Sequence, residues 1–332
     1  MNKKNVFYNT DCIEGSKKYL QDNSIDLIIS DPPFAIQGDK LDKHYNRKEE
    51  FVVDGYIEIP KEEYPSFSDS WIKECERVLR PGGCIYIVSG YTNLVDILNA
   101  LKKTKLEEIN HIIWKYNFGV FTSRKYVSSH YHIMFYQKTG GKRVFNTNCR
   151  FGSDERDENN GSLNYKDRED VWIINREYKP GEVKNKNELP KELLKKMIQY
   201  SSNPGDLVCD LFLGSFSTAK VAIGLNRFAV GFEKNTHSYN HQIKETNKVI
   251  PGSLIDTLRI PSKNNNINSG KSWSEEDKGK LISSYKKLLK KEGSKQKAIK
   301  VLCEEFGRGR FSILNIINMM EDKTSDSLFS KE

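Results

Sequence analysis

Short apolar runs alternate with amphipathic stretches along most of this chain. Residues 25–30 (IDLIIS) form a largely apolar run, as expected for a strand buried on both faces of a sheet. Apolar residues at helical spacing predict a helix over 67–79, which the sequence RPGG (80–83) is expected to end. This alternation is typical of a doubly wound, mostly parallel sheet with crossover helices. The other expected strands are 5–8, 84–89, 111–116, 131–138, 170–174, 205–212 and 227–233, and the other expected helices are 15–21, 91–103, 189–201 and 217–225.

The alternation breaks down in two places. Residues 140–185 are rich in Asn, Asp, Arg and Gly and form an insert, and residues 259–272 form a polar linker. Beyond the linker, amphipathic stretches predict three helices, the first with Ser274 as its N-cap. The predicted organisation is a main domain over 1–258 that contains the insert, the linker, a three-helix unit over 273–320 and a tail over 321–332.

Charge is distributed unevenly along the chain. The whole sequence of 332 residues carries a formal net charge of +8. Residues 271–310 hold twelve Lys or Arg against six Asp or Glu, so most of the excess lies near the C-terminus. Such a segment suits an acidic partner such as nucleic acid, and the alternative is a solvated lysine-rich surface.

The six cysteines are scattered and include no C-x-x-C pair. This spacing favours free thiols in a reducing compartment over disulfides or a zinc site, and we expect no metal. The N-terminal residues lack an apolar signal core, and no stretch is long enough to cross a bilayer. We therefore expect a cytoplasmic protein that has no membrane partner.

The buried run 25–30 ends on Asp31-Pro32-Pro33-Phe34. Ligands of open α/β sheets bind outside the carboxyl ends of strands. Pro32 and Pro33 have no N–H donors, so the turn offers only acceptors: the Asp31 carboxylate and backbone carbonyls. These acceptors would bind the two hydrogens of an amine, and Phe34 would stack on a planar group. An exocyclic amine of a nucleobase fits this description. The alternative is a loop turn without chemistry.

A second candidate site lies within residues 205–233. The expected strand there contains Asp210, a Gly/Ser loop follows it, and the next strand ends in Glu233. A glycine in such a loop lets the backbone approach a cofactor, and a later acidic residue can bind ribose hydroxyls. The loop lacks the G-x-G-x-x-G pattern of dinucleotide sites, and Glu233 taken alone is equally consistent with a solvated strand end.

Over residues 5–245 the chain resembles the β group of DNA amino-methyltransferases, which use S-adenosylmethionine and whose catalytic motif precedes the cofactor motif. NTDCIEGSKKYLQDNSIDLIISDPPF is similar to the acidic segment and D-P-P-[YF] motif of that family. SWIKECERVLRPGGCIYIV, DVWII, SNPGDLVCDLFLGS and GFEKNTHSY are similar to later segments, in the same order. The resemblance implies a Rossmann-like, seven-stranded class I methyltransferase fold, and the amphipathic pattern beyond the linker adds a small C-terminal all-α unit.

The resemblance also implies a role for each matching residue. Asp31 and the Pro32 carbonyl would hold the target amine, Pro33 would stiffen the turn, and Phe34 would stack on a base flipped out of double-stranded DNA. Asp11 and Cys12 would lie near the adenine of the cofactor, and Glu233 would bind its ribose. The loop for the methionine end of the cofactor would comprise Asp210, Phe212, Gly214, Ser215 and Thr218.

Three departures from the family pattern stand out. Phe216 replaces a glycine of the family's G-S-G-T-T loop, so the cofactor contact there is open to question. NKNELP (185–190) stands where the family has H-P-T-Q-K-P and matches only at Pro190. His130-Tyr131 stands in place of a His-Glu pair.

DNA contacts are expected outside the sheet. The insert 140–185 lies where this group often carries target recognition, and the three-helix unit opens with WSEED, which resembles Myb/SANT-like domains. In that case Arg308 and Arg310 would start a recognition helix, and the alternative is a bundle used for packing or dimerisation. The candidate arginines of the insert, for phosphates or guanine edges, are Arg143, Arg150, Arg156, Arg168 and Arg176.

The leading hypothesis is a site-specific DNA adenine-N6 methyltransferase of a restriction–modification system. Asp31 favours adenine over cytosine-N4, because serine is commoner at this position in cytosine-N4 enzymes of the family. The alternatives are a cytosine-N4 methyltransferase and a DNA-binding regulator on a degenerate methyltransferase scaffold. The resemblance further suggests a homodimer and a cognate restriction endonuclease as partners.

Overall fold

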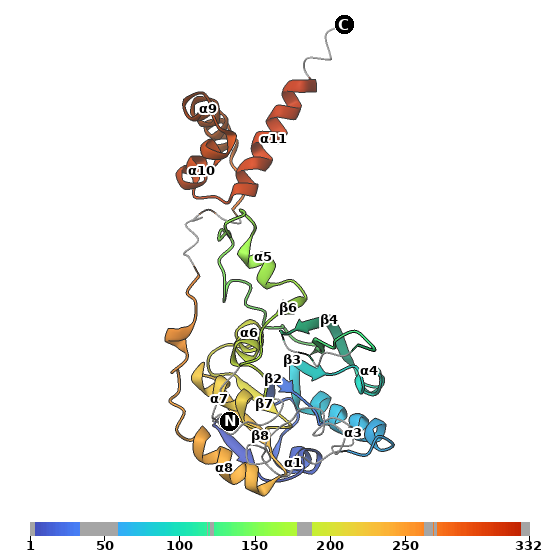
Figure 1. The fold of residues 1–332 in the computed structure, drawn as a ribbon. Helices are drawn as coiled ribbons and strands as arrows, with labels where there is room; N and C mark the ends of the chain where they lie inside the picture. The colour runs from blue at the N-terminus through green and yellow to red at the C-terminus, as the bar shows by residue number, and fades with distance from the viewer. Residues whose placement is uncertain are drawn as a thin grey trace. The chain divides into compact units, whose positions relative to one another are not determined.

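A computed structural model describes residues 4–33, 59–117, 119, 123–177, 188–261, 268 and 271–326 (Figure 1). The chain divides into two compact units. The first, here called the sheet unit, comprises Met1–Arg150 and Tyr165–Ile260, and the second, here called the helical unit, comprises Phe151–Asn164 and Pro261–Glu332.

One sheet of eight strands forms the centre of the sheet unit, in the order β1-β8-β7-β2-β3-β5-β4-β6. The pattern along the chain predicted eight strands, whereas the family resemblance implied seven. The short strand β6, predicted over 170–174, pairs with β4 at one edge. The strands are β1 (Val6–Tyr8), β2 (Ile25–Ser30), β3 (Leu79–Ser89), β4 (Leu106–Lys115), β5 (His130–Lys138), β6 (Val171–Ile173), β7 (Leu207–Asp210) and β8 (Phe228–Phe232).

The sheet is mostly parallel, as predicted. Only β5 runs antiparallel to both of its neighbours, β3 and β4, and every other pairing is parallel. The connection from β2 leads to β3 on one side, whereas the connection from β7 leads to β8 on the other. The doubly wound topology is thereby confirmed, and the chain reverses its winding between β2 and β7.

Helices cover both faces of the sheet (Figure 1). Side chains from α1, α3 and α4 pack on one face in one buried cluster, and side chains from α6 and α7 pack on the other in a second cluster. The helices of the chain are α1 (Cys12–Tyr19), α3 (Tyr64–Val78), α4 (Leu94–Lys102), α5 (Leu163–Asp167), α6 (Lys191–Ser201), α7 (Ser217–Gly224), α8 (Thr236–Thr246), the 3₁₀ turn η2 (Ile255–Thr257), α9 (Glu275–Glu292), α10 (Lys295–Phe306) and α11 (Arg310–Asp326).

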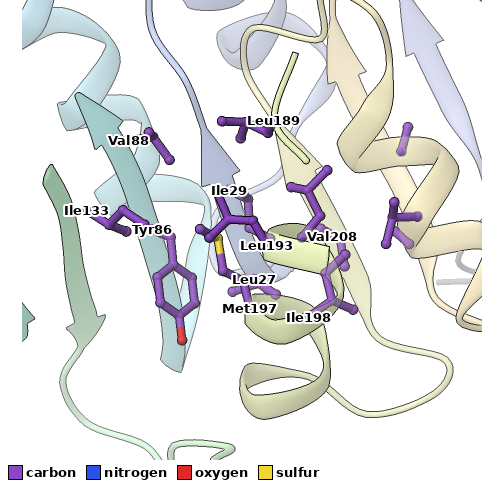
Figure 2. Close-up of a cluster of buried hydrophobic side chains, with 14 of the residues drawn as sticks. Leu27, Ile29, Tyr86, Val88, Ile133, Leu189, Leu193, Met197, Ile198 and Val208 are labelled. Atoms are coloured by element: carbon purple, nitrogen blue, oxygen red, sulfur yellow. The ribbon is translucent and has the colours of Figure 1, made fainter. Parts of the chain in front are cut away.

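The core beneath α6 shows how the central strands are held. Figure 2 shows Leu193, Met197 and Ile198 of α6 facing Leu27 of β2 and Val208 of β7. All five side chains are at most 1% exposed. Burial on this scale contributes roughly 1.5–3 kcal/mol per large aliphatic side chain, so this cluster fixes the pairing of β2 with β7.

The helix before RPGG ends as predicted, but the strand begins five residues earlier than the predicted start at residue 84. Helix α3 ends at Val78, and β3 already begins at Leu79, so residues 80–83 belong to the strand and shift its register against β2. Asp26, which is buried, holds this irregular start: it accepts from Arg80 Nε at 2.7 Å and from the Leu207 amide at 2.8 Å. One carboxylate therefore ties the entries of β2, β3 and β7 together.

The helical unit contains the three predicted helices. Ser274 caps α9 as expected, because its Oγ accepts from the Asp277 amide at 3.1 Å. Leu281, Leu302 and Ile317, one from each helix, are fully buried together. Helix α11 continues to Asp326, so the first residues of the predicted tail are helical.

All six cysteines are free thiols, four of them buried, while Cys149 and Cys303 are half-buried. Within the described parts of the chain, no helix is long and apolar enough to span a bilayer.

Two glycines offer a matched test of the packing at the end of β7. A Cβ on Gly231 would clash with the Asp210 carbonyl oxygen and would lie 2.7 Å from Leu213 Cγ, whereas a Cβ on Gly279 in α9 meets nothing within 4 Å. We expect Gly231→Ala to lower the free energy of unfolding by about 1–3 kcal/mol through overpacking. The control Gly279→Ala should raise helix stability by about 0.5–1 kcal/mol. Urea titrations followed by circular dichroism measure both, and equal stability of the two variants would contradict this packing.

Candidate active site

Three carboxyl groups meet at the carboxyl end of the central strands. Asp31 directly follows β2, Asp210 ends β7, and Glu233 directly follows β8. These three strands are neighbours in the sheet and run in parallel. The carboxyl groups therefore surround the point at which the winding of the sheet reverses, where ligands of such sheets bind.

Asp31 is an acceptor without a donor. Its Oδ1 atom is buried and has no hydrogen-bond partner among the described residues. Burial raises the pKa of the Asp31 carboxyl to about 8; the charge of Asp210 adds to the shift, and the charge of Arg176 opposes it. Pro32 and Pro33 follow with no amide hydrogen to offer. Phe34 lies outside the described residues, so its stacking role stays a prediction.

Asp210 organises the loop that follows it. The carboxyl group, which is 6% exposed, accepts from the Phe212 amide at 3.0 Å and from the hydroxyl of Thr218 at the start of α7. Burial raises its pKa to about 6, although both hydrogen bonds act in the opposite direction. The loop is therefore built around a carboxyl group that is largely removed from water.

Glu233 clamps the same loop from the next strand. Its Oε2 accepts from the Gly214 amide at 2.9 Å, and its Oε1 accepts from the Asn235 amide at 2.7 Å. Burial raises the pKa of this carboxyl, and the two amide bonds partly offset the rise. Because each carboxylate oxygen can accept more than one hydrogen bond, capacity remains for hydroxyl groups of a ligand.

Phe212 and Ser215 lie in the same loop. The Phe212 ring packs edge-on against Trp71 of α3, with ring centroids 5.3 Å apart. Ser215, which is 9% exposed, has its Oγ 2.5 Å from Ser217 Oγ, and Ser217 in turn donates to Glu188. These contacts hold the loop from both sides.

The side chain of Phe216, which stands in place of a family glycine, points away from the ligand side of the loop. Its backbone is left-handed, with φ of 60°, and its ring is fully buried. The ring packs against Phe7 and Tyr239, with centroids 5.2 and 6.1 Å away. The side chain that replaces a glycine thus fills the core beneath the loop and leaves the ligand side of the loop to its backbone.

Asp11 and Cys12 lie beside the Glu233 strand end. Asp11 caps α1 by accepting from the Ile13 amide at 2.9 Å, and Cys12 is buried, which raises the pKa of its thiol. Asn9, just before them, donates to the Glu233 carbonyl at 2.8 Å. The fold therefore brings these two residues to the cluster of acidic groups, although Asp11 uses one oxygen as a helix cap.

Two of the predicted DNA-binding arginines of the insert, Arg143 and Arg150, have partners within the sheet unit. The Arg150 Nε donates to Asp167 at 3.0 Å, and the Arg143 guanidinium stacks 5.2 Å from the Phe145 ring centroid. Their contacts to DNA stay predictions.

Arg308 has partners within the helical unit. It is 6% exposed, donates to the carbonyl oxygens of Lys271 and Ser272, and lies 4.2 Å from the centre of the Trp273 ring. Its guanidinium stabilises the segment that precedes α9, and its contact with DNA stays a prediction. Arg310 is exposed, and its role stays a prediction.

Sequence reasoning missed two tyrosines next to Asp31. Burial raises the pKa of both Tyr64, from α3, and Tyr131, from β5, and the charge of Asp31 adds a smaller rise. Tyr131 is part of the His130-Tyr131 pair that replaces the family's His-Glu pair, and this departure was the signal that sequence reasoning could have used. Tyr64 lies before the helix predicted over 67–79, so the pattern gave no signal for it.

Comparison with known proteins places this geometry among DNA-modifying enzymes. The model of the DNA methylase family N6_N4 matches residues 25–245. The type II methyltransferase M.HpaI of Haemophilus parainfluenzae is 32% identical over 225 residues, which are 66% of this chain and 67% of the relative. M.HinfI of Haemophilus influenzae is 28% identical over 69% of this chain and 66% of the relative. M.BamHI of Bacillus amyloliquefaciens is 32% identical over 68% of this chain and 53% of the relative. The matches thus span between about half and two thirds of these relatives.

Solved structures support the fold. TTHA0409 of Thermus thermophilus, in complex with S-adenosyl-L-methionine, superposes with a TM-score of 0.55 at 20% identity, over 75% of this chain and 95% of that one. The cytosine-N4-specific DNA methyltransferase PvuII superposes with a TM-score of 0.56 at 16% identity, over 79% of this chain and 95% of that one. The sheet unit therefore has the class I methyltransferase fold.

The raised pKa of Asp31 predicts a cost in stability. A folded pKa of about 8 lies above the ordinary value of about 3.9, so the native state binds more protons between these values, and stability falls as pH rises through this window. Asp31→Asn should therefore raise Tm at pH 8, by about 2–4 °C for each kcal/mol relieved, and the gain should shrink toward pH 4. Thermal melts across this range measure the effect, with the exposed Asp256→Asn as control. A gain independent of pH would contradict the assignment.

Proposed function

The chain belongs to the N6/N4 family of DNA methylases, and from this premise we propose that it is a site-specific DNA adenine-N6 methyltransferase that uses S-adenosylmethionine. The relatives are type II methyltransferases by name, which supports a role in a restriction–modification system. The proposed homodimer and cognate endonuclease rest on the family resemblance alone.

The buried, unpartnered Oδ1 of Asp31 is the observation that carries this proposal. An aromatic amine is a poor nucleophile because its lone pair is delocalised into the ring. Asp31 and the Pro32 carbonyl accept the two amine hydrogens and favour the form in which the lone pair stays on nitrogen. With its pKa raised to about 8, Asp31 is also suited to take the proton that the methylated amine loses.

The remaining acidic groups fit the proposed cofactor. When bound, S-adenosylmethionine supplies an electrophilic methyl group on a positively charged sulfur. Burial raises the pKa values of Asp210 and Glu233, neither of which forms a salt bridge among the described residues, and a cationic ligand would favour their charged forms. Glu233 retains acceptor capacity for ribose hydroxyls, and the Gly214–Ser215 backbone would face the methionine end. Because the Phe216 ring lies in the core, it no longer favours a degenerate scaffold.

Substitution of Asp31 tests the catalytic assignment. We expect Asp31→Ala to lower methyl transfer by about 10²–10⁴-fold, because the amine loses its acceptor, while affinity for S-adenosylmethionine stays largely unchanged. Glu233→Ala is the matched control and should instead weaken cofactor binding. Calorimetry and a methylation assay measure both quantities. Retained activity in Asp31→Ala would remove Asp31 from the mechanism, and no cofactor affinity in the unaltered protein would favour a DNA-binding regulator.

The choice of base rests on Asp31, since serine is commoner at this position in cytosine-N4 enzymes of the family. Methylation-sensitive sequencing of DNA from cells that express the protein reports base and site together. Methyl groups on cytosine N4 would overturn the adenine assignment and leave the methyltransferase assignment intact.

For the helical unit we propose contact with DNA phosphates through a lysine patch at the junction of α9 and α10. Between residues 286 and 300 the chain carries seven lysines and one acidic residue, and all seven lysines are exposed. This surface is more accessible to DNA than Arg308, which is buried and internally bound. Because the contact is to phosphates, it would add affinity without reading sequence.

Salt dependence tests the lysine patch, which is represented by Lys290, Lys291 and Lys297. Replacing all three by alanine in the full chain should make the plot of log affinity for DNA against log salt shallower by about 0.9 for each phosphate that the variant no longer neutralises. Lys280→Ala is the control, since Lys280 already pairs with Glu276 at 2.6 Å. An unchanged slope in the triple variant would favour a bundle that serves packing or dimerisation.

A further inference from the structure

Arg176 occupies an aromatic cage close to Asp31. The cage consists of Trp114, Tyr116 and Tyr131, whose ring centroids lie 5.9, 4.8 and 5.3 Å from the guanidinium carbon. The three rings also contact one another, with centroids 5.4–5.6 Å apart. A guanidinium surrounded by aromatic faces keeps its charge and its orientation.

The backbone fixes this cage to the sheet. Trp114 Nε1 donates to the Ile174 carbonyl at 2.8 Å, and the Ile174 amide donates to the Lys115 carbonyl at 3.1 Å. The segment that follows β6 is therefore anchored to the end of β4 two residues before Arg176. Trp114 and Tyr131 are cross-strand partners in β4 and β5, so the rings come from adjacent positions.

The described hydrogen bonding of Arg176 leaves its Nε–H without a partner. Its Nη2 donates to the Tyr131 hydroxyl at 3.1 Å. Its Nε is buried and has no partner among the described residues. The aromatic rings of the cage stabilise the positive charge of the guanidinium, but they do not provide a hydrogen-bond acceptor for its Nε–H. A buried donor without a partner costs free energy, which a ligand with an acceptor would recover.

Asp31 and Arg176 act on the same space. The strand register places both at the same edge of the sheet. Asp31 follows Ser30, which pairs with Ile87 of β3. Tyr131, which accepts from Arg176, precedes His132, which pairs with Ser89 of β3. In agreement with this placement, the charge of Arg176 opposes the rise in the pKa of Asp31 that burial causes. Asp31 contributes a buried acceptor without a donor, and Arg176 contributes a buried donor without an acceptor. A ligand that satisfies both must carry a donor and an acceptor on neighbouring atoms.

We infer that Arg176 is a specificity-determining residue that donates a hydrogen bond from Nε to the ring nitrogen next to the target amine. This inference rests on the proposed function and extends it. Adenine and cytosine each present an amine beside an unprotonated ring nitrogen. At the ring position that corresponds to this amine, thymine and guanine present a carbonyl oxygen beside a ring N–H, which would meet Asp31 with an acceptor and Arg176 with a donor. The pair would therefore reject both of those bases.

A cycle of protein and substrate substitutions tests the inference. The variant is Arg176→Met, which keeps an unbranched side chain without a donor, and the substrate is a duplex whose target adenine is replaced by 1-deazaadenine, which has C–H in place of N1. Loss of a hydrogen bond from a charged donor should cost about 10–100-fold in kcat/KM. We expect kcat/KM of the unaltered protein to fall by this factor when 1-deazaadenine replaces adenine. For Arg176→Met, kcat/KM should fall only by the effect that replacing N1 has on the reactivity of the amine itself. If sequencing identifies cytosine as the target, 3-deazacytosine takes its place.

Arg143→Met is the matched control, because Arg143 also stacks on two aromatic rings, those of Phe135 and Phe145. The ratio of its kcat/KM on the deaza substrate to its kcat/KM on the natural substrate should equal the ratio found for the unaltered protein. The same deaza effect in Arg176→Met as in the unaltered protein would overturn the inference and leave the methyltransferase assignment standing, because Arg176 would then only brace the sheet edge. Absence of methylation on any DNA would overturn the proposed function and this inference with it. Cofactor calorimetry and a thermal melt of Arg176→Met exclude misfolding as the cause of a loss.

Discussion

At the carboxyl ends of β2 and β7, the chain buries two carboxyl groups on neighbouring parallel strands, and burial opposes the ionisation of both. Desolvation raises the pKa of Asp31 to about 8 and that of Asp210 to about 6. Such an arrangement lowers the stability of the folded state near neutral pH and persists only where the surrounding packing holds it. The rest of the sheet unit supplies that packing.

The supports of the site come from elements that are distant in the sequence. The aliphatic cluster beneath α6 holds β2 against β7, and Asp26 ties both strands to β3 at the opposite end of the sheet (Figure 2). Glu233 fixes the loop after β7 from the neighbouring strand, and Gly231 leaves room for that loop to approach. Each support restrains backbone, which lets Asp31 keep an oxygen free for a ligand.

The departures from the family pattern illustrate how such a site tolerates substitution. Phe216 adopts a left-handed backbone that a glycine would adopt at lower cost, and burial of its ring against Phe7 and Tyr239 offsets that cost. Tyr131 stands where the family has an acidic residue, and its hydroxyl accepts from Arg176. In both positions the new side chain contacts residues that the local sequence does not reveal.

The fold class could be predicted from the pattern of apolar residues, because buried strands and amphipathic helices have periods that are visible without tertiary information. The sequence also determined where Asp31, Asp210 and Glu233 would stand, since residues that follow parallel strands share one edge of the sheet. The pattern placed the start of β3 too late, at residue 84, because the bond between Arg80 and Asp26 that stabilises the irregular strand joins residues 54 positions apart. The directions of side chains came from the tertiary structure alone: Arg308 packs within the helical unit, Phe216 lies in the core and Arg176 lies in an aromatic cage. Side-chain direction depends on which partners the fold brings within reach, and those partners lie on other elements.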